Sequence, residues 1–401
     1  MRSIRRKAGS ADAGPRFRGS LILLVAALVL MSSAGRAQEA WLVTYGPGAE
    51  VWEMFGHNAL WLRDPATGLD HTYSFGYFEI DRPGFHLDFA RGIMDYYGAA
   101  SPAQGEFAFY RQRGRSISAQ RLALSPGQVR ELHQALHAAI YPHPQFYAYD
   151  YFRANCSTWL RDLINQATGD RVRPVLKALP AEQTYRDHTR RMTADRPWIQ
   201  TGILLLMGPS VDQPMTAWEE AFLPEALADW LELVNLSDGP LIVEHRVIHD
   251  PGRFVPPSVA RSPWLLLLII GLGIGGAIVL ATRAGESTAR WTVRLGAGLA
   301  GLAGAVLVWM VVATDHQDAA GNLSLLLLHP FWWLLLVPAP ARWRAGLRLV
   351  LLVCLALGAM VLAWPGLLQD RPALVGLLLP GLLAILWAAG RRTAAVPLKP
   401  S

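Results

Sequence analysis

Five long apolar stretches in the last third of the chain constrain its fold more than any other feature. The stretches cover residues 264–282, 295–314, 323–340, 347–364 and 373–390. Each is close to the ~20 residues that an α-helix needs to cross a bilayer core of ~30 Å. We therefore expect an all-α bundle of about five transmembrane helices over residues 263–392, followed by a cytoplasmic tail over residues 393–401.

The linkers between these stretches alternate in charge, and the alternation predicts which side of the membrane each one occupies. Basic residues follow the first, third and fifth stretches: Arg283, Arg290, Arg294, Arg342, Arg344, Arg348, Arg391, Arg392 and Lys399. The second linker carries Asp315, His316 and Asp318, and the fourth carries Asp370 and Arg371. Lysine and arginine accumulate in cytoplasmic loops, so the basic linkers are expected inside and the others outside. Topology thus explains much of the net charge of +6, and no nucleic-acid partner is expected.

The start of the chain is typical of an export signal. Basic residues precede an apolar run over 21–31, and small residues lead to a plausible cleavage point after Ala37. Residues 1–37 are therefore interpreted as a signal peptide, with an uncleaved signal anchor as the alternative. Both interpretations export residues 38–262. We expect a multi-pass protein of the bacterial inner (cytoplasmic) membrane whose N-terminal domain lies in the periplasm.

The exported region has the pattern of an α+β domain. Short runs typical of strands occur at 41–45, 59–62, 71–75 and 117–124, and the turn-rich segment 64–68 predicts a hairpin between the second and third. Ser125-Pro126-Gly127-Gln128 has the form of a capping box and predicts a helix that ends near Ile140. A second helix is predicted from Cys156, with Asn155 as its N-cap.

Cys156 is the leading candidate for chemistry. The other cysteine, Cys354, falls inside a predicted membrane helix, so the two cannot pair and the exported domain carries one free thiol. The first turn of a helix presents unpaired N–H groups and a positive dipole end, which are expected to lower the thiol pKa below its free value of about 8.5. A buried, inert thiol remains the alternative.

His57 is the candidate base for this thiol, because it follows a glycine at the start of a predicted strand. If the hairpin turn is centred on residues 66–67, Arg63 faces Asp70 and His57 shares a sheet face with Ser74. Ser74 is then close enough to orient the imidazole. A backbone N–H at the helix start, with Asn155 or Ser157 nearby, is the candidate oxyanion stabiliser.

The sequence contains no close spacing of His, Cys and carboxylate residues that would predict a metal site. It also lacks a phosphate-binding loop, a dinucleotide fingerprint and a serine-nucleophile elbow. We therefore expect no metal and no cofactor.

Several segments also carry a family resemblance. They are TYGPGAEVWEMFGHNALWL, YSFGYF, YDYFRANCSTWLRDLI, WEEAFLPEAL and DHQDAAGNLSLLLLHP. The order of Gly-His on a strand and Asn-Cys at a helix start resembles the circularly permuted papain-like folds, which include NlpC-type proteins and lecithin retinol acyltransferase. The match is closer to the Lnb-type lipoprotein N-acyltransferases, and it covers most of the chain, including the membrane half.

The resemblance implies a permuted papain-like (NlpC-type) periplasmic domain that moves an acyl chain from a phospholipid to the α-amino group of a lipoprotein's lipidated N-terminal cysteine. Cys156 would be the nucleophile and His57 the base. The partners would be a phospholipid donor, a lipoprotein acceptor and the membrane itself. The family often has Asn in a Y-N-F-G motif at the third position, where this chain has Ser74.

Two other functions fit the same residues. One is a membrane-tethered Cys–His hydrolase that cleaves lipid ester or amide bonds or cell-wall peptide bonds, and the other is a non-catalytic envelope assembly protein. The polar loop with Asp315, His316 and Asn322 is likewise open to two interpretations. It either reconnects two membrane helices or faces the substrate, where it would hold a lipid headgroup or the acceptor amine.

Overall fold

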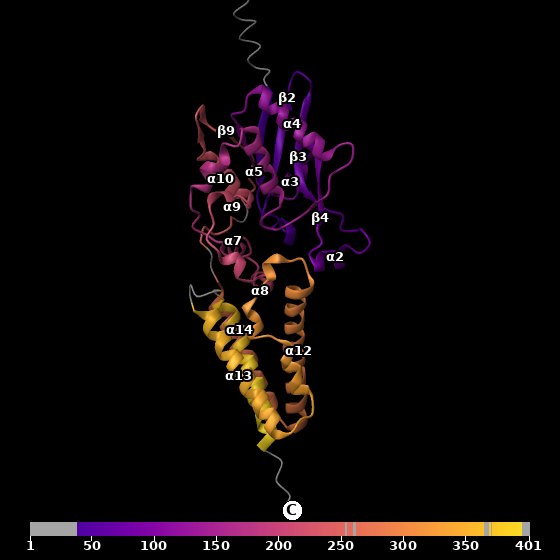
Figure 1. The fold of residues 1–401 in the computed structure, drawn as a ribbon, viewed down its shortest axis with the longest axis vertical. Coiled ribbons are helices and arrows are strands. Elements are labelled where there is room, and N and C mark those ends of the chain that lie inside the picture. Colours follow the sequence, from indigo (N-terminus) through magenta and orange to yellow (C-terminus); the bar gives the residue numbers. More distant parts are fainter. Residues whose placement is uncertain (1–37, 253–254, 260–261, 365–368, 370, 395–401) are drawn as a thin grey trace, which may run out of the picture.

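The computed structural model describes residues 38–252, 255–259, 262–364, 369 and 371–394 of the chain. The predicted signal peptide and most of the predicted cytoplasmic tail lie outside the described residues. The described chain is mixed α and β, with an antiparallel sheet in the N-terminal region and helices in the C-terminal region. The two regions follow one another along the longest axis of the molecule (Figure 1).

One antiparallel sheet of seven strands organises the N-terminal region, in the order β6-β4-β3-β2-β1-β5-β9. Its strands are β1 (Glu39–Tyr45), β2 (His57–Asp64), β3 (Leu69–Tyr77), β4 (Asp95–Pro102), β5 (Ile117–Leu122), β6 (Tyr147–Ala148) and β9 (Ile242–His249). A separate ribbon pairs β7 (Asn235–Leu236) with β8 (Gly239–Pro240). The strands at 41–45, 59–62, 71–75 and 117–124 were predicted from the sequence, and each lies within or largely overlaps an observed strand.

Helices cover both faces of this sheet because hydrophobic residues occupy both faces of the central strands. On one face, Leu42 and Leu60 pack against α4 (Pro126–Ile140), α5 (Cys156–Ala167) and α10 (Pro224–Glu232). On the other, Trp41 and Trp61 pack with Phe107 of α3 (Ala103–Gln112). Burying each such side chain contributes roughly 1.5–3 kcal/mol, so the strand positions are well fixed.

Several shorter helices complete the N-terminal region. They are η2 (Val51–Glu53), α2 (Phe85–Arg91), α6 (Val172–Lys177), α7 (Tyr185–Met192), α8 (Pro197–Leu206), η3 (Pro209–Asp212) and α9 (Ala217–Glu220). Of these, α2, α7 and α8 lie at the level where the sheet region meets the long helices (Figure 1). The apolar helix α8 sends Leu205 and Leu206 against the hydrophobic cluster of the membrane region.

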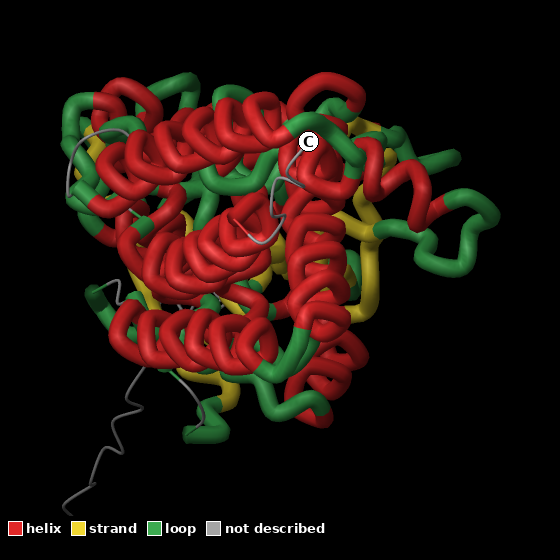
Figure 2. The backbone as a smooth tube through the Cα atoms, turned by 90° about the horizontal axis from the view of Figure 1, so that it is seen from below, coloured by secondary structure: helices red, strands yellow, loops and turns green. Residues whose placement is uncertain are grey.

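The membrane region differs from the five-helix expectation. Among the described residues, four helices are long and apolar enough to cross a bilayer. They are α11 (Trp264–Arg283), α12 (Glu286–Ala313), α13 (Ala341–Ala363) and α14 (Pro372–Ala394). Seen from below, these helices lie in front of the strands (Figure 2). The predicted third helix, over 323–340, instead forms two short 3₁₀ segments, η5 (Leu323–Leu326) and η6 (Pro330–Leu336), after η4 (Gln317–Ala319).

Proline and tryptophan explain why the 323–340 segment is not an α-helix. Pro330 removes a backbone donor and holds His329 extended. The segment runs along α12, where Trp333 Nε1 donates to the carbonyl of Gly298 at 3.0 Å. A Cβ at Gly301 would overlap the Trp333 indole. Its packing against a small-residue face of α12 therefore replaces the regular helix that hydropathy alone predicted.

Candidate active site

Cys156 is the first residue of α5, as the sequence predicted. The Asn155 side chain accepts a hydrogen bond from the Thr158 backbone N–H at 3.0 Å, and the Thr158 hydroxyl accepts one from the Asn155 N–H at 2.8 Å. The Asn155 amide also donates to the carbonyls of Tyr151 and Phe222, each at 2.9 Å. These bonds fix the helix start. They also occupy the Asn155 side chain, so it caps the helix rather than pointing to a substrate.

The Cys156 thiol is buried against strand β2. Backbone N–H groups of Asn58, Ser157 and Cys156 itself lie close enough to its sulfur to favour the thiolate, and the Ser157 hydroxyl lies 3.8 Å from Sγ. The same hydroxyl donates to Asn58 Oδ1 at 2.8 Å, which ties α5 to β2. Burial raises the pKa of the Cys156 thiol, and these hydrogen bonds offset only part of the rise. The expectation of a lowered thiol pKa is therefore wrong, because burial outweighs the effect of the helix terminus.

His57 is the first residue of β2, directly before Asn58. Its ring lies parallel to those of Tyr45 and Tyr110, with ring centroids 6.0 and 6.3 Å away. Burial and, to a smaller extent, the positive charge of Arg115 together lower the pKa of His57 to about 3. The imidazole is therefore neutral at pH 7 and able to accept a proton.

Cys156 lies against Asn58, the residue that follows His57. Among the described residues, however, no hydrogen bond links the Cys156 and His57 side chains. Among the described residues, the His57 ring has no hydrogen-bonding partner, and none of the bonds formed by Cys156 reaches it. Catalytic hydrogen bonds are often long in structures without substrate and tighten when the substrate binds. The arrangement thus supplies a neutral thiol, a neutral imidazole and three backbone N–H groups at the same end of the sheet.

Ser74 lies where the predicted hairpin register puts it. Arg63 pairs with Asp70 and Ala59 with Ser74, as expected. The Ser74 hydroxyl, however, donates to Glu106 Oε1 at 3.2 Å. Its observed partner is therefore a buried carboxylate rather than the His57 imidazole.

Sequence analysis did not identify Glu106, which lies on α3 and collects three donors. Besides Ser74, the Tyr45 hydroxyl donates to Oε1 at 2.8 Å and the Thr72 hydroxyl to Oε2 at 2.6 Å. Burial raises the pKa of Glu106, and the three hydrogen bonds oppose that rise. Because Tyr45 stacks beside His57, Glu106 fixes the wall against which the imidazole lies. The sequence does contain one sign of this buried carboxylate, because Glu106 stands next to Phe107 on an otherwise apolar face of the helix.

Gly76 borders the Cys156 thiol. It sits at an irregularity in the pairing of β3 with β4, with a φ of +100° that side chains rarely allow. A Cβ placed there would lie 3.9 Å from Cys156 Cβ and 3.8 Å from the Tyr149 ring. These are ordinary contact distances, so it is the positive φ, rather than a lack of space, that favours glycine beside the thiol.

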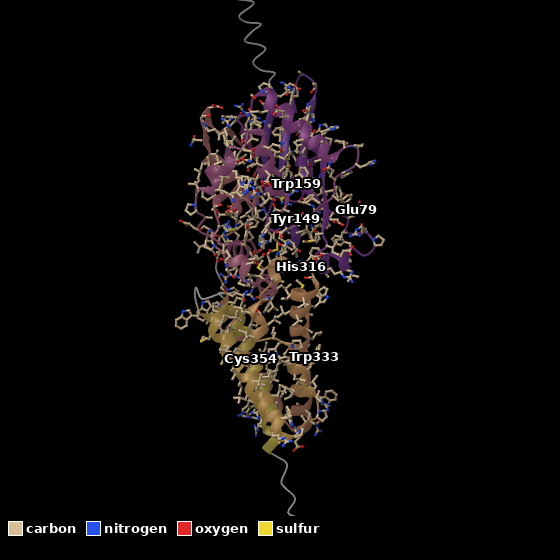
Figure 3. All side chains as sticks on the ribbon, viewed as in Figure 1. Glu79, Tyr149, Trp159, His316, Trp333 and Cys354 are labelled. Carbon is tan, nitrogen blue, oxygen red and sulfur yellow. The ribbon has the colours of Figure 1, made fainter. Side chains whose placement is uncertain are left out.

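The polar loop between α12 and η5 docks onto the end of α2 and onto the segment that precedes Cys156. The Asp315 N–H donates to the Arg91 carbonyl at 2.7 Å, and His316 Nε2 lies 3.1 Å from the Phe89 carbonyl oxygen. The His316 ring also stacks on Tyr151, with centroids 6.3 Å apart. Figure 3 shows His316 at the junction of the two regions, below Tyr149.

Asp318 completes this docking and Asn322 lies elsewhere. Both carboxylate oxygens of Asp318 accept hydrogen bonds of 2.9 Å from the Arg153 guanidinium. Arg153 lies three residues before Cys156. Asn322 is buried, and its amide contacts the Leu205 carbonyl, the Ser324 N–H and Arg371. The three polar residues of the predicted substrate-side loop therefore do not form one cluster. Among the described residues, no group of three or more His, Cys, Asp or Glu side chains is placed to hold a metal ion.

Comparison with family models gives two adjacent matches. Residues 32–191 match the Lnb N-terminal periplasmic domain, and residues 256–390 match the Lnb transmembrane domain. Comparisons with curated proteins and with solved structures give no match. The two matched domains follow one another in the order seen in the structure, with the candidate site in the first and the long helices in the second. The chain therefore belongs to the Lnb family and is a bacterial membrane protein with a periplasmic N-terminal domain.

Proposed function

We propose that this protein is a lipoprotein N-acyltransferase that carries the acyl chain as a thioester on Cys156. The donor is a phospholipid, and the acceptor is the α-amino group of a lipidated N-terminal cysteine. The observation that carries the proposal is the buried thiol at the capped start of α5, with backbone N–H groups of Asn58 and Ser157 close to its sulfur. Membership of the Lnb family supports an acyl-transfer reaction in particular.

The first half-reaction transfers the acyl chain to the enzyme. His57 takes the thiol proton as Cys156 sulfur attacks the ester carbonyl of the phospholipid. The tetrahedral intermediate collapses, the ester C–O bond breaks, and the lysophospholipid alkoxide leaves with the proton from His57. Both reacting groups start neutral, so charge separates in the transition state. Backbone N–H groups near the thiol are the candidate donors to the oxyanion that forms.

The second half-reaction regenerates the thiol. The neutral amine of the lipoprotein attacks the thioester, and the bond between carbon and sulfur breaks as the amide forms. The amine gives up one proton and the Cys156 thiolate gains one, with His57 carrying it. His316 is a second candidate base on the acceptor side, because its ring stacks on Tyr151 near the start of α5. Asp315, which is exposed in the same loop, is a candidate to hold the positively charged amine before it reacts.

Aromatic and apolar side chains near the site favour a lipid donor. Successive ring contacts of 4.4, 5.0, 5.4 and 6.0 Å link Tyr149, Tyr96, Phe78, Phe85 and Phe89. This series begins beside Cys156 and ends on α2, which touches the loop after α12. On α2, Leu87 and Phe89 are 55% and 41% exposed. Exposed apolar side chains at this level favour contact with acyl chains over contact with a soluble peptide.

The proposed topology extends the family assignment. We propose an inner-membrane protein whose export signal lies in residues 1–37 and whose periplasmic domain covers residues 38–262. The chain would cross the bilayer five times within residues 263–392, with the 3₁₀ segment over 323–340 as the third crossing. Reporter fusions placed after Arg283 and after Asp318 test this, since they should report opposite sides. Reports from the same side would remove the five-crossing topology.

The central experiment is mass spectrometry of the intact protein purified from its membrane. We expect an acyl adduct that maps to Cys156 and that hydroxylamine removes. Cys156→Ser should lose the adduct and all acyl transfer while the protein accumulates normally. Cys354→Ser is the matched control, since Cys354 lies among the membrane helices (Figure 3), and it should be close to neutral.

The fate of the acyl chain separates transfer from hydrolysis. Incubation with a diacylated lipoprotein should convert the adduct into an N-acylated product, whereas a hydrolase would release free fatty acid whether or not lipoprotein is present. Near-normal transfer by the Cys156→Ser variant would rule out the thioester mechanism altogether.

A further inference from the structure

Helix α2 is largely apolar, yet it is not buried. Its sequence, FHLDFAR, contains two phenylalanines and a leucine, and none of its residues is buried. By contrast, the valine, leucine and isoleucine residues of α4 all lie in the core. Over residues 79–93, four large apolar side chains are between 40% and 55% exposed: Ile80, Leu87, Phe89 and Ile93. Such a concentration within one short segment indicates a contact surface for an apolar partner.

The end of α12 fixes the level of α2 relative to the bilayer. Residues 295–314 carry no charge and lie between Arg294 and Asp315. As a helix that rises ~1.5 Å per residue they span ~30 Å, which is the thickness of the hydrocarbon core. Because the N-terminal domain is periplasmic, Asp315 marks the periplasmic boundary of that core.

Helix α2 is attached directly to this boundary. The Asp315 N–H donates to the Arg91 carbonyl at 2.7 Å, and His316 Nε2 lies 3.1 Å from the Phe89 carbonyl oxygen. A Cβ at Gly92 would lie 2.8 Å from the His316 backbone nitrogen, so the two backbones are in contact. Figure 1 shows α2 beside the upper end of α12, at the edge of the junction. A helix as short as α2 is only ~10 Å long, so all of it lies close to the bilayer surface.

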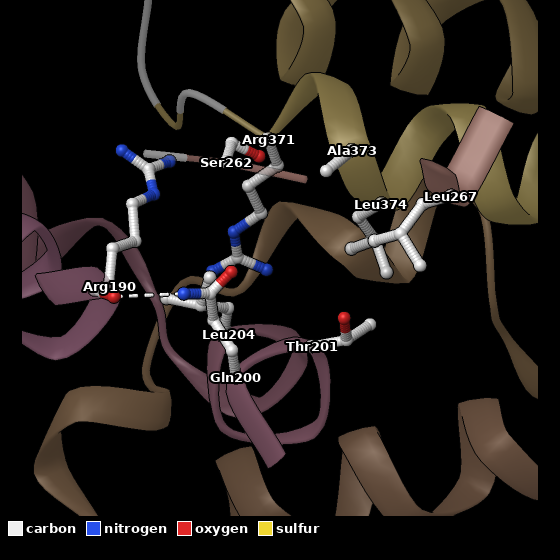
Figure 4. Close-up of a pocket in the computed structure, with 9 residues that line it drawn as sticks. All are labelled: Arg190, Gln200, Thr201, Leu204, Ser262, Leu267, Arg371, Ala373 and Leu374. Carbon is white, nitrogen blue, oxygen red and sulfur yellow. Dashed lines mark hydrogen bonds between the residues drawn. The ribbon is translucent and has the colours of Figure 1, made fainter. Parts of the chain in front are cut away.

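A cavity at the same junction does not provide an alternative place for lipid. It lies between α8, α11 and the start of α14, beside Arg371 (Figure 4). Its volume is about 20 Å³, which is room for about one water molecule. The cavity is therefore too small for an acyl chain, and the exposed surface of α2 is the better place for lipid contact at this level.

The charges of this segment are compatible with the headgroup region. Arg82 donates to Asp88 Oδ2 at 2.8 Å, so these two charges compensate each other. Helices that lie in a membrane surface bury their apolar side chains ~5–10 Å into the boundary between headgroups and acyl chains. We propose that residues 79–93 form an interfacial anchor in the periplasmic leaflet, with Leu87 and Phe89 in contact with the upper acyl carbons. The proposal concerns membrane contact and does not depend on acyl transfer.

Fluorescence quenching at single cysteines tests the depth of this segment. Leu87→Cys is introduced into the full-length protein together with Cys156→Ala and Cys354→Ala, labelled with bimane, and placed in nanodiscs of phosphatidylethanolamine and phosphatidylglycerol. Lipids brominated near the carbonyl end of the acyl chain should lower the emission at least about twofold, because that is the depth of an interfacial helix. Lipids brominated near the methyl end should quench less, and aqueous iodide should quench weakly.

Two matched positions define the limits of the measurement. Leu233→Cys replaces a leucine that is 61% exposed and follows α10, which lies away from the junction (Figure 1), and it should be quenched by iodide alone. Leu302→Cys, at a position 54% exposed within the membrane span of α12, should be quenched most by bromine near the methyl end. Ile80→Cys is a second probe of the anchor and should behave like Leu87→Cys.

Either control pattern, seen at position 87 or at position 80, would overturn the proposal. Quenching by iodide alone would place the segment in water, and strongest quenching near the methyl end would place it within the hydrocarbon core. Because the labelled protein lacks Cys156, neither outcome bears on the proposed acyl transfer. Absence of an acyl adduct on the wild-type protein would in turn count against the proposed function alone.

Discussion

The low pKa of His57 predicts that acyl-enzyme formation hardly depends on pH between 7 and 5. A histidine with the ordinary pKa of about 6.5 is roughly three-quarters neutral at pH 7 and about 3% neutral at pH 5. A reaction that needs the neutral ring would then slow about 25-fold over this interval. Burial and Arg115 lower the pKa of His57 to about 3, so the ring stays neutral throughout. The rate should therefore change by less than about twofold, since the Cys156 thiol is also neutral over this range.

The assay is single-turnover acylation in lipid nanodiscs, quenched in acid and read as thioester by mass spectrometry. Arg115→Gln should raise the pKa of His57, because it removes a repelling charge, and should shift the acid limb of the profile to higher pH. Arg113→Gln is the matched control. Arg113 and Arg115 both contact the Glu53 carboxylate, at 2.6 and 3.7 Å, but Arg113 is not among the causes of the His57 shift. A wild-type rate that falls more than about tenfold by pH 5, with a midpoint near 6.5, would refute this account of the base.

Three further predictions address the surroundings of the thiol. Gly76→Ala should lower the thermal stability by about 1–2 kcal/mol, because alanine is strained at this positive φ, and it should slow acylation; an unchanged melting curve would contradict this. Asp318→Asn should weaken the bidentate contact with Arg153 and increase amide hydrogen exchange in residues 149–155, whereas equal protection in both proteins would argue against a docking role. His316→Ala should leave thioester formation on Cys156 intact but slow its transfer to the lipoprotein, so the adduct should accumulate in a single-turnover assay; unchanged transfer, or loss of the adduct itself, would exclude the acceptor-side role.

Local patterns predicted the parts of the site that depend on neighbouring residues. The start of α5 at Cys156 followed from Asn155 as a cap, and the pairing of Arg63 with Asp70 followed from the turn between two alternating strands. Both features are set by hydrogen bonds within a few residues or across one turn. For this reason they could be read from short segments of sequence.

Features that depend on tertiary burial were not predicted correctly. The direction of the Cys156 pKa shift was wrong because the sequence shows the helix start but not the desolvation of the sulfur. Glu106 was missed because its donors come from three different strand positions. The segment over 323–340 has the hydropathy of a membrane helix, and only its packing on the glycine face of α12 shows the different backbone.

The docking of the loop after α12 has a mechanical consequence. Through Asp318 and Arg153, the loop that follows the 28-residue helix α12 is held against the segment just before Cys156. The height of the thiol above the bilayer is therefore set by a rigid rod and a clamp rather than by a flexible tether. On the proposed function, Cys156 would act at a fixed distance from the bilayer and would select substrates whose reactive group reaches that distance. Bilayer thickness then becomes a variable that tunes the reaction, since a thicker membrane would draw the rod inward and bring the thiol closer to the lipid surface.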